Sequence, residues 1–133
     1  MKKWIAIFLA VLLLCGCGKE QPDDTAVFYG FEDDLGRVVE VSAPKRVACL
    51  LGSFAQIWQL AGGEVIATAD DAWDDLDLEL SEDCVNLGNT KELSLELLLS
   101  AQPDFVLASS NTRQNVEWKE TLEAAGITVA YFE

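Results

Sequence analysis

Beyond residue 44, short apolar runs alternate with amphipathic segments, and this alternation limits the possible folds more than any other feature. The apolar runs cover residues 46–51, 64–69, 85–88, 104–109 and 127–132, and each has the length of a buried strand. Strands that are apolar throughout and are separated by helices belong to parallel sheets covered on both faces. The sequence therefore predicts an α/β fold with a mainly parallel sheet flanked by helices.

Three of the intervening segments have helical spacing. Ser53, followed three residues later by a glutamine, has the spacing of a capping box. Ser94 can cap a second helix, which ends before a proline. A third helix is expected over residues 112–125, and Gly126 would end it.

Two further segments stand apart from this pattern. Residues 27–31 and 37–41 are β-prone runs joined by turn residues, which predicts a β-hairpin before the sheet. Residues 70–83 are rich in aspartate and glutamate but lack the glycine and the terminal glutamate of a calcium-binding EF-hand loop. We therefore expect a solvated acidic loop there.

The N-terminus has the features of a targeting segment. Two lysines precede the apolar residues 4–14, and about 11 residues are too few to span a bilayer, which needs about 20. Small residues then lead to Cys17 in the order of a lipobox. This order predicts a signal peptide (1–16), a lipid-modified cysteine and a tether (17–26), with the protein anchored on the outer face of the cytoplasmic membrane. The alternative is an ordinary secretory signal with incidental cysteines.

Composition excludes several functions. Nine Lys and Arg against 23 Asp and Glu give a net charge of −14, which disfavours nucleic acid as a partner. The chain has no histidine, so no resident metal or cofactor is expected. No catalytic motif stands out, and we do not expect an enzyme. Cys49 and Cys84 could be free buried thiols or a disulfide outside the membrane.

The chain resembles the N-terminal lobe of the substrate-binding proteins of iron-siderophore, haem and cobalamin ABC importers. The resemblance rests on residues 31–37, 44–47, 51–53, 86–89, 95–99 and 102–106. It implies that residues 27–133 are one lobe of a two-lobed binding protein, with the second lobe absent through an apparent truncation. It also implies a solute-binding role for a ferric chelate or related ligand, which the protein would present to an ABC permease. The alternative is a truncated structural or adhesion lipoprotein lobe that transports nothing.

A ligand would lie beyond the carboxyl ends of the parallel strands. Lys91 and Arg113 could pair with anionic oxygens of the ligand, and Trp73 could supply flat apolar contact. The expected ligand-binding residues are Ser53, Phe54, Trp73, Asn89, Thr90, Lys91, Ser110, Asn111, Arg113 and Tyr131. For Ser53, Phe54 and Arg113 the alternatives are a helix cap, a core side chain and a surface charge.

The resemblance also assigns a role to Glu96. This residue matches the family position, near the start of a helix, where a glutamate meets arginines of the permease. Such charge pairing raises the association rate and fixes the orientation of the partners. The alternative is a glutamate in a first helical turn, where the helix dipole favours negative charge.

Overall fold

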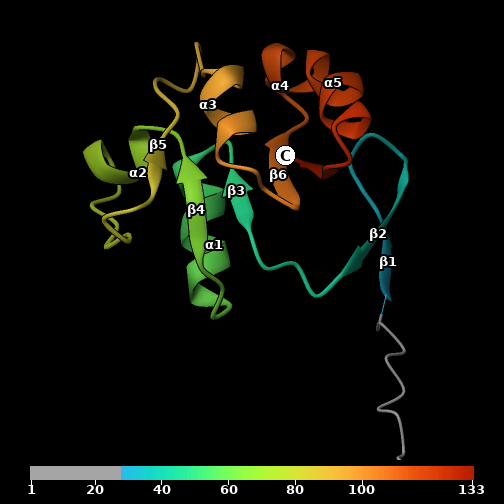
Figure 1. The fold of residues 1–133 in the computed structure, drawn as a ribbon, viewed down its shortest axis with the longest axis horizontal. Coiled ribbons are helices and arrows are strands. Elements are labelled where there is room, and N and C mark those ends of the chain that lie inside the picture. Colours follow the sequence, from blue (N-terminus) through green and yellow to red (C-terminus); the bar gives the residue numbers. More distant parts are fainter. Residues whose placement is uncertain (1–27) are drawn as a thin grey trace, which may run out of the picture.

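Two sheets organise residues 28–133, the part of the chain that this computed structural model describes (Figure 1). The predicted signal peptide (1–16), the lipidation site Cys17 and the tether (17–26) lie outside the described residues and remain predictions. Within residues 28–133, no helix has both the length and the apolar character needed to cross a membrane.

The larger sheet has five strands in the order β5-β4-β3-β6-β7, and every neighbouring pair is parallel. All residues of the central strand and of the strand beside it, β6, are buried, as expected for a sheet covered on both faces. The predicted parallel sheet is confirmed. Its strands are β3 (Val47–Cys49), β4 (Val65–Thr68), β5 (Val85–Asn86), β6 (Phe105–Ser109) and β7 (Thr128–Phe132).

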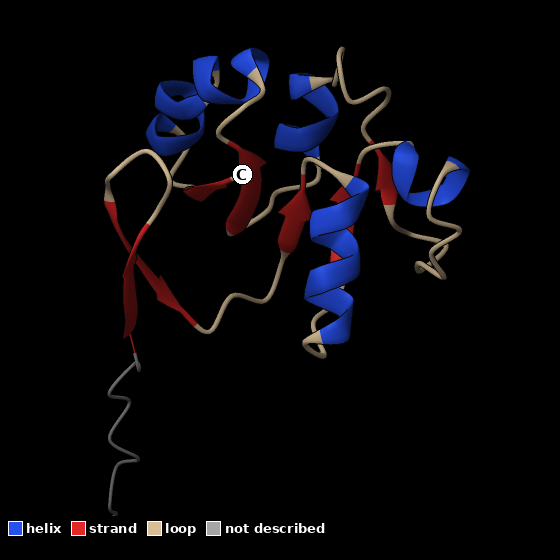
Figure 2. Cartoon of the chain, turned by 180° about the vertical axis from the view of Figure 1, so that it is seen from behind, coloured by secondary structure: helices blue, strands red, loops and turns tan. Residues whose placement is uncertain are grey.

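Helices lie on both faces of this sheet (Figures 1 and 2). On one face, Leu98 and Leu122 pack into a core with Tyr131. On the other face, Phe54 packs with Phe105. The first face is covered by α3 (Leu95–Ser100), α4 (Arg113–Glu117) and α5 (Lys119–Ala124), and the second carries α1 (Gly52–Leu60) with α2 (Asp71–Asp74) beside it.

The predicted hairpin is present as β1 (Phe28–Glu32) and β2 (Val38–Ser42), paired antiparallel. A buried carboxylate in its turn fastens it to the lobe. The side chain of Asp33 accepts a hydrogen bond from the Arg37 guanidinium at 2.7 Å and one from the backbone N–H of Tyr131 at 3.3 Å. Arg37 also pairs with Glu123 and lies over the ring of Tyr131, 5.2 Å from its centroid.

The helix expected over 112–125 differs from the prediction. It is divided into α4 and α5 at Trp118, whose ψ of −8° departs from helical values. Val116 and Trp118 pack from one side of this bend, and Leu122 from the other, against the same core cluster. The bend therefore lets both halves pack on the same core cluster, which a periodicity count alone does not predict.

The two cysteines of the described chain are free thiols. Cys49 ends β3 and Cys84 precedes β5, with β4 between the two strands. Two strand spacings amount to about 9.5 Å, which exceeds the roughly 7 Å that a disulfide allows between Cα atoms. Burial raises the pKa of the Cys49 thiol to about 12 and that of Cys84 to about 11, so both are unreactive at neutral pH.

Candidate functional site

The loops that follow the parallel strands meet along one edge of the sheet, which we call the rim. The rim comprises residues 50–53, 69–73, 87–91, 110–113 and 133. The chain runs from β3 outward to β5 and then returns to β6 on the other side of β3. The loops after β3 and β6 are therefore neighbours whose helices lie on opposite faces, and such a switch point opens a crevice for a ligand.

The start of α1 is fixed by a residue from another loop. Ser53 is exposed and caps nothing, so the predicted capping box is wrong. Instead, both carboxylate oxygens of Asp71 accept a hydrogen bond from the N–H of Gly52, at 2.9 and 3.0 Å. This contact joins the loops after β3 and β4. Burial and the neighbouring Asp70 and Asp75 raise the pKa of Asp71, opposing the hydrogen bond from Gly52.

The finding that Asp71 rather than Ser53 caps α1 gives a first prediction. Asp71→Ala should destabilise the chain by about 1–2 kcal/mol because α1 loses its cap. Ser53→Ala should change stability by less than about 0.5 kcal/mol, since its hydroxyl makes no capping bond. Urea denaturation followed by circular dichroism would measure both free energies of unfolding. Equal losses in the two variants would contradict the assignment.

The loop after β5 is held by a side chain that the sequence did not single out. The amide of Gln114 in α4 accepts from the N–H of Leu93 at 3.1 Å and donates to its carbonyl at 3.2 Å. The side chain of Asn89 accepts a hydrogen bond from the N–H of Lys91 at 3.0 Å, which stabilises the turn of this loop. Ser94 caps α3 through the N–H of Leu97, which confirms the predicted cap. No local pattern in the sequence indicates this role, because Leu93 lies 21 residues before Gln114.

The loop after β6 carries the other polar residues of the rim. The hydroxyl of Ser109 accepts from the N–H of Asn111 at 3.2 Å. The side chain of Arg113 is 91% exposed and pairs with Glu117 at 2.7 Å, one helical turn away. Its guanidinium is accessible to solvent. Because exposed ion pairs are weak, Arg113 could leave Glu117 and bind an anionic group of a ligand instead.

Two of the expected ligand-binding residues are buried in this lobe. Tyr131 is fully buried, and its hydroxyl donates to the carbonyl of Asn115 at 2.8 Å. Phe54 is also buried, with its ring edge-on to Phe132 at 6.3 Å. The ring of Tyr131 lies in the core, whereas Phe54 points from α1 onto the sheet, where it takes the alternative role of a core side chain.

The remaining predicted residues come together on the rim. Ser53, Asn89, Lys91, Asn111 and Arg113 are exposed there, while Trp73, Thr90 and Ser110 are partly buried. Whether any of them binds a ligand stays a prediction. In residues 28–133, no group of three or more His, Cys, Asp or Glu side chains is placed to hold a metal ion.

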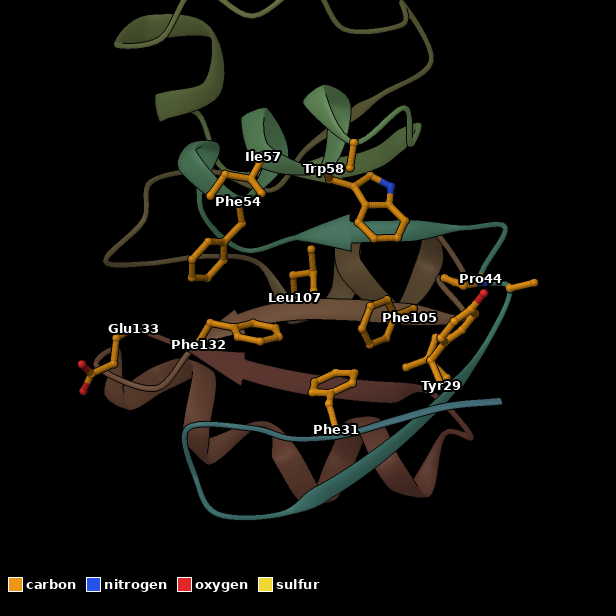
Figure 3. A pocket seen from close by; sticks show the side chains of 13 residues that line it. Tyr29, Phe31, Pro44, Phe54, Ile57, Trp58, Phe105, Leu107, Phe132 and Glu133 are labelled. Carbon is orange, nitrogen blue, oxygen red and sulfur yellow. The ribbon is translucent and has the colours of Figure 1, made fainter. Parts of the chain in front are cut away.

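A second hollow, which we call the apolar groove, was not predicted. It has a volume of about 630 Å³ and lies between α1, the hairpin and the sheet (Figure 3). The lining is almost wholly apolar and aromatic, with Glu133 at one end. The lining residues are Tyr29, Phe31, Val41, Ala43, Pro44, Phe54, Ile57, Trp58, Ala61, Phe105, Leu107, Phe132 and Glu133.

Comparison with known proteins places this fold. The family model described as periplasmic binding protein matches residues 47–133. The Fe(3+)-citrate-binding protein YfmC of Bacillus subtilis (strain 168) is 29% identical over 130 residues, which cover 86% of this chain and 40% of that protein.

Solved structures with the same fold share less sequence. The catecholate-siderophore binding protein VctP from Vibrio cholerae matches with a TM-score of 0.62 and 18% identity, over 80% of this chain and 37% of that one. The iron uptake ABC transporter substrate-binding protein PiuA from Streptococcus pneumoniae matches with a TM-score of 0.62 and 19% identity, over 82% and 38%. The chain thus spans about 40% of the length of these relatives.

Proposed function

The chain belongs to the periplasmic binding protein family, and from this premise we propose that it is a solute-binding component of an ABC importer for a ferric siderophore or related metal chelate. The observation that carries the proposal is the rim, where loops from successive parallel strands converge on the switch point beside β3. The names of its relatives, which include a ferric citrate-binding protein and a catecholate-siderophore binding protein, supply the ligand class. The lobe would form one half of a cleft.

Two basic side chains of the rim could bind anionic groups of a ligand, although the rim also carries the acidic Asp70, Asp71 and Glu133. Within the described chain, Lys91 and Arg113 are the basic residues on this edge, whereas Lys45 and Arg46 precede β3 at the opposite edge. Both rim cations stand on the face of the sheet where α3 and α4 begin. A carboxylate-bearing chelate would gain charge-assisted hydrogen bonds there, worth about 1.5–3 kcal/mol each.

Delivery to the membrane is the second half of the proposal. Glu96 is exposed in the first turn of α3, where a permease arginine could reach it. The lipid-modified Cys17 would hold the protein on the outer face of the cytoplasmic membrane, beside the permease. A Glu96 carboxylate at the surface would guide encounter and orientation rather than supply most of the affinity.

Paramagnetic NMR would test ligand binding at the rim. Ferric citrate should broaden the backbone amide signals of residues 53, 89–91 and 110–113, because the unpaired electrons of the ion relax nearby protons. The gallium complex, which is diamagnetic, should shift the same signals without broadening them. Because one lobe supplies half a cleft, we expect a Kd of about 1 mM, or about −4 kcal/mol.

Matched lysine variants sharpen this test. Lys91→Ala should weaken binding roughly tenfold through loss of a charge-assisted contact, whereas Lys45→Ala, at the opposite edge, should leave the Kd unchanged. Broadening centred on residues 45 and 104 would count against the proposal. So would the absence of broadening with ferric citrate, a ferric catecholate and ferric haem together with the absence of signal shifts with cobalamin, which is diamagnetic. The second outcome would favour a structural lipoprotein lobe.

A further inference from the structure

β7 is an outer strand of the five-stranded sheet, so one row of its backbone groups faces away from β6. The N–H of Thr128 and the C=O of Phe132 form hydrogen bonds toward the β6 side. Because this direction alternates along a strand, Val129 and Tyr131 direct their N–H and C=O groups outward. Outward groups without partners are a template on which another strand can pair.

The turn of the hairpin binds these outward groups, although it is not a strand. The C=O of Tyr131 accepts from the N–H of Asp34 at 2.9 Å, and its N–H donates to the carboxylate of Asp33 at 3.3 Å. The C=O of Val129 accepts from the guanidinium of Arg37 at 3.0 Å. Figure 1 shows the turn beside the dark red β7. Two side chains and one backbone amide thus take the place of a sixth strand.

The two edges of the sheet differ in how much they need such a cover. β5, at the far edge, has only two residues and is too short to hold another strand well. β7 has five residues, all uncharged and mainly β-branched or aromatic. Segments of this composition pair readily when their edge is open. Without the turn, β7 would therefore be the adhesive edge of the lobe.

The outward groups of β7 are spaced to fit a second copy of the same strand. In an antiparallel pair, two opposed residues exchange both of their N–H···O=C bonds. When Val129 lies opposite Tyr131 of the second copy, two-fold symmetry places Tyr131 opposite Val129 of that copy. All outward groups of both residues are then paired, so the segment is its own best partner.

We propose that the turn of the hairpin closes the edge of the sheet by imitating a strand, and that its release makes β7 the docking edge for β7 of a second copy. The polar contacts of the turn thereby keep the lobe monomeric. This inference concerns association of the chain with itself and does not depend on the identity of the ligand.

Charge gives the proposed dimer a recognisable dependence on salt. The net charge of −14 opposes association of two copies, whereas the paired segment itself is uncharged. Raising the salt from about 0.1 M to about 1 M shortens the screening length from about 10 Å to about 3 Å. Association through β7 should therefore strengthen with salt, while association through ion pairs would weaken.

Asp33→Asn tests the proposal in the full chain, because an amide nitrogen cannot accept the hydrogen bonds from Tyr131 and Arg37. Sedimentation equilibrium at several protein concentrations would measure association. We expect the variant to form dimers with a dissociation constant about tenfold or more below that of the wild type. Asp34→Asn removes the same charge, but its backbone N–H still donates to Tyr131, so it should stay monomeric. Asp71→Ala, which loses stability away from this edge, should also stay monomeric.

The amide of Val129 locates the contact. In the Asp33→Asn dimer its hydrogen exchange, followed by NMR, should slow as the protein concentration rises. Adding Val129→Pro should restore the monomer, because proline removes an outward N–H and is tolerated where a strand edge faces solvent.

Three results would overturn the proposal. One is an Asp33→Asn chain that stays monomeric at high salt. Another is a dimer in which the exchange of the Val129 amide does not depend on protein concentration. The third is equal association of Asp34→Asn or Asp71→Ala, which would assign the effect to lost charge or lost stability instead.

Discussion

Asp33→Asn is expected to lower the free energy of unfolding by about 3–5 kcal/mol, the cost of breaking a buried ion pair by removing one partner. One carboxylate oxygen of Asp33 accepts from the N–H groups of Leu35 and Arg37, at 3.1 and 3.0 Å. The other accepts from the Arg37 guanidinium, at 3.2 and 2.7 Å, and from the N–H of Tyr131. An amide nitrogen in place of this second oxygen would face donors only.

The effect should extend beyond the hairpin turn. Arg37 donates to the carbonyl of Val129 at 3.0 Å and pairs with Glu123, so it links the hairpin to β7 and α5. Once Asp33 no longer holds the guanidinium, these contacts lose their orientation. The hairpin should therefore separate from the sheet before the sheet unfolds, and amide hydrogen exchange should show β1 and β2 exchanging first.

The same carboxylate predicts a dependence on pH. Burial raises the pKa of Asp33, but the hydrogen bonds from Arg37 and Tyr131 outweigh it and hold the pKa below the ordinary value of 3.8. A lowered pKa in the folded state gives stability that is present above about pH 4 and is lost as the pH falls through the folded-state value. The wild-type chain should lose this contribution below about pH 4, and Asp33→Asn should reduce that loss.

The neighbouring residue provides the control. Asp34 is exposed and accepts one hydrogen bond, from the N–H of Glu133 at 2.7 Å, so Asp34→Asn should cost no more than about 1 kcal/mol. Urea denaturation at neutral pH and again below the ordinary aspartate pKa would measure both variants. A loss below about 1 kcal/mol for Asp33→Asn would mean that the hairpin is held by apolar packing instead.

The sequence predicted the sheet well because the physical cause is local. Runs such as 104–109 are mainly apolar and do not alternate with polar residues. A strand of this kind is stable mainly inside a sheet whose two faces are both covered. The prediction from sequence failed at the start of α1, where the capping partner of Gly52 is Asp71, 19 residues away. Ser53 has the right spacing, but spacing says nothing about a carboxylate from another loop.

The position of the rim was predicted from the sequence, but its detailed contacts were not. Parallel strands bring their carboxyl ends to one edge whatever their sequence, so the rim followed from the fold. The burial of Tyr131 was not predicted, because a residue near the end of an edge strand can face solvent or core, and its partners, Arg37 and Asn115, are distant in sequence. Gln114 and the apolar groove were missed for the same reason: each depends on elements that meet only in the folded chain.

Gly52→Ala is the second substitution with a large expected effect. A Cβ atom at position 52 would lie 2.6 Å from the backbone nitrogen of Ala72 and 2.8 Å from its Cα. No rotamer change can relieve a clash with backbone, so α2 must move away from α1. Overpacking of this kind costs about 1–3 kcal/mol. We expect a loss of stability at the upper end of this range, because the N–H at position 52 would also lose its hydrogen bond to the Asp71 carboxylate.

Gly30→Ala is the matched control for this substitution. At position 30 the nearest atom to an added Cβ is the Cγ of Glu40 at 4.0 Å, an ordinary contact, and alanine suits a strand better than glycine. That variant should be neutral or more stable by up to about 1 kcal/mol. Thermal denaturation of the two alanine variants compares the same chemical change in two environments.

The consequence for the rim is what makes Gly52→Ala informative. Trp73 lies in α2, directly after the residue that would be displaced, so its fluorescence should shift in Gly52→Ala and not in Gly30→Ala. A shift together with lost stability would mean that the loops after β3 and β4 form one fixed unit that is already shaped before a ligand arrives. If Gly52→Ala kept the wild-type stability and spectrum, α2 would be free to slide, and this part of the rim would take its shape only when a ligand binds.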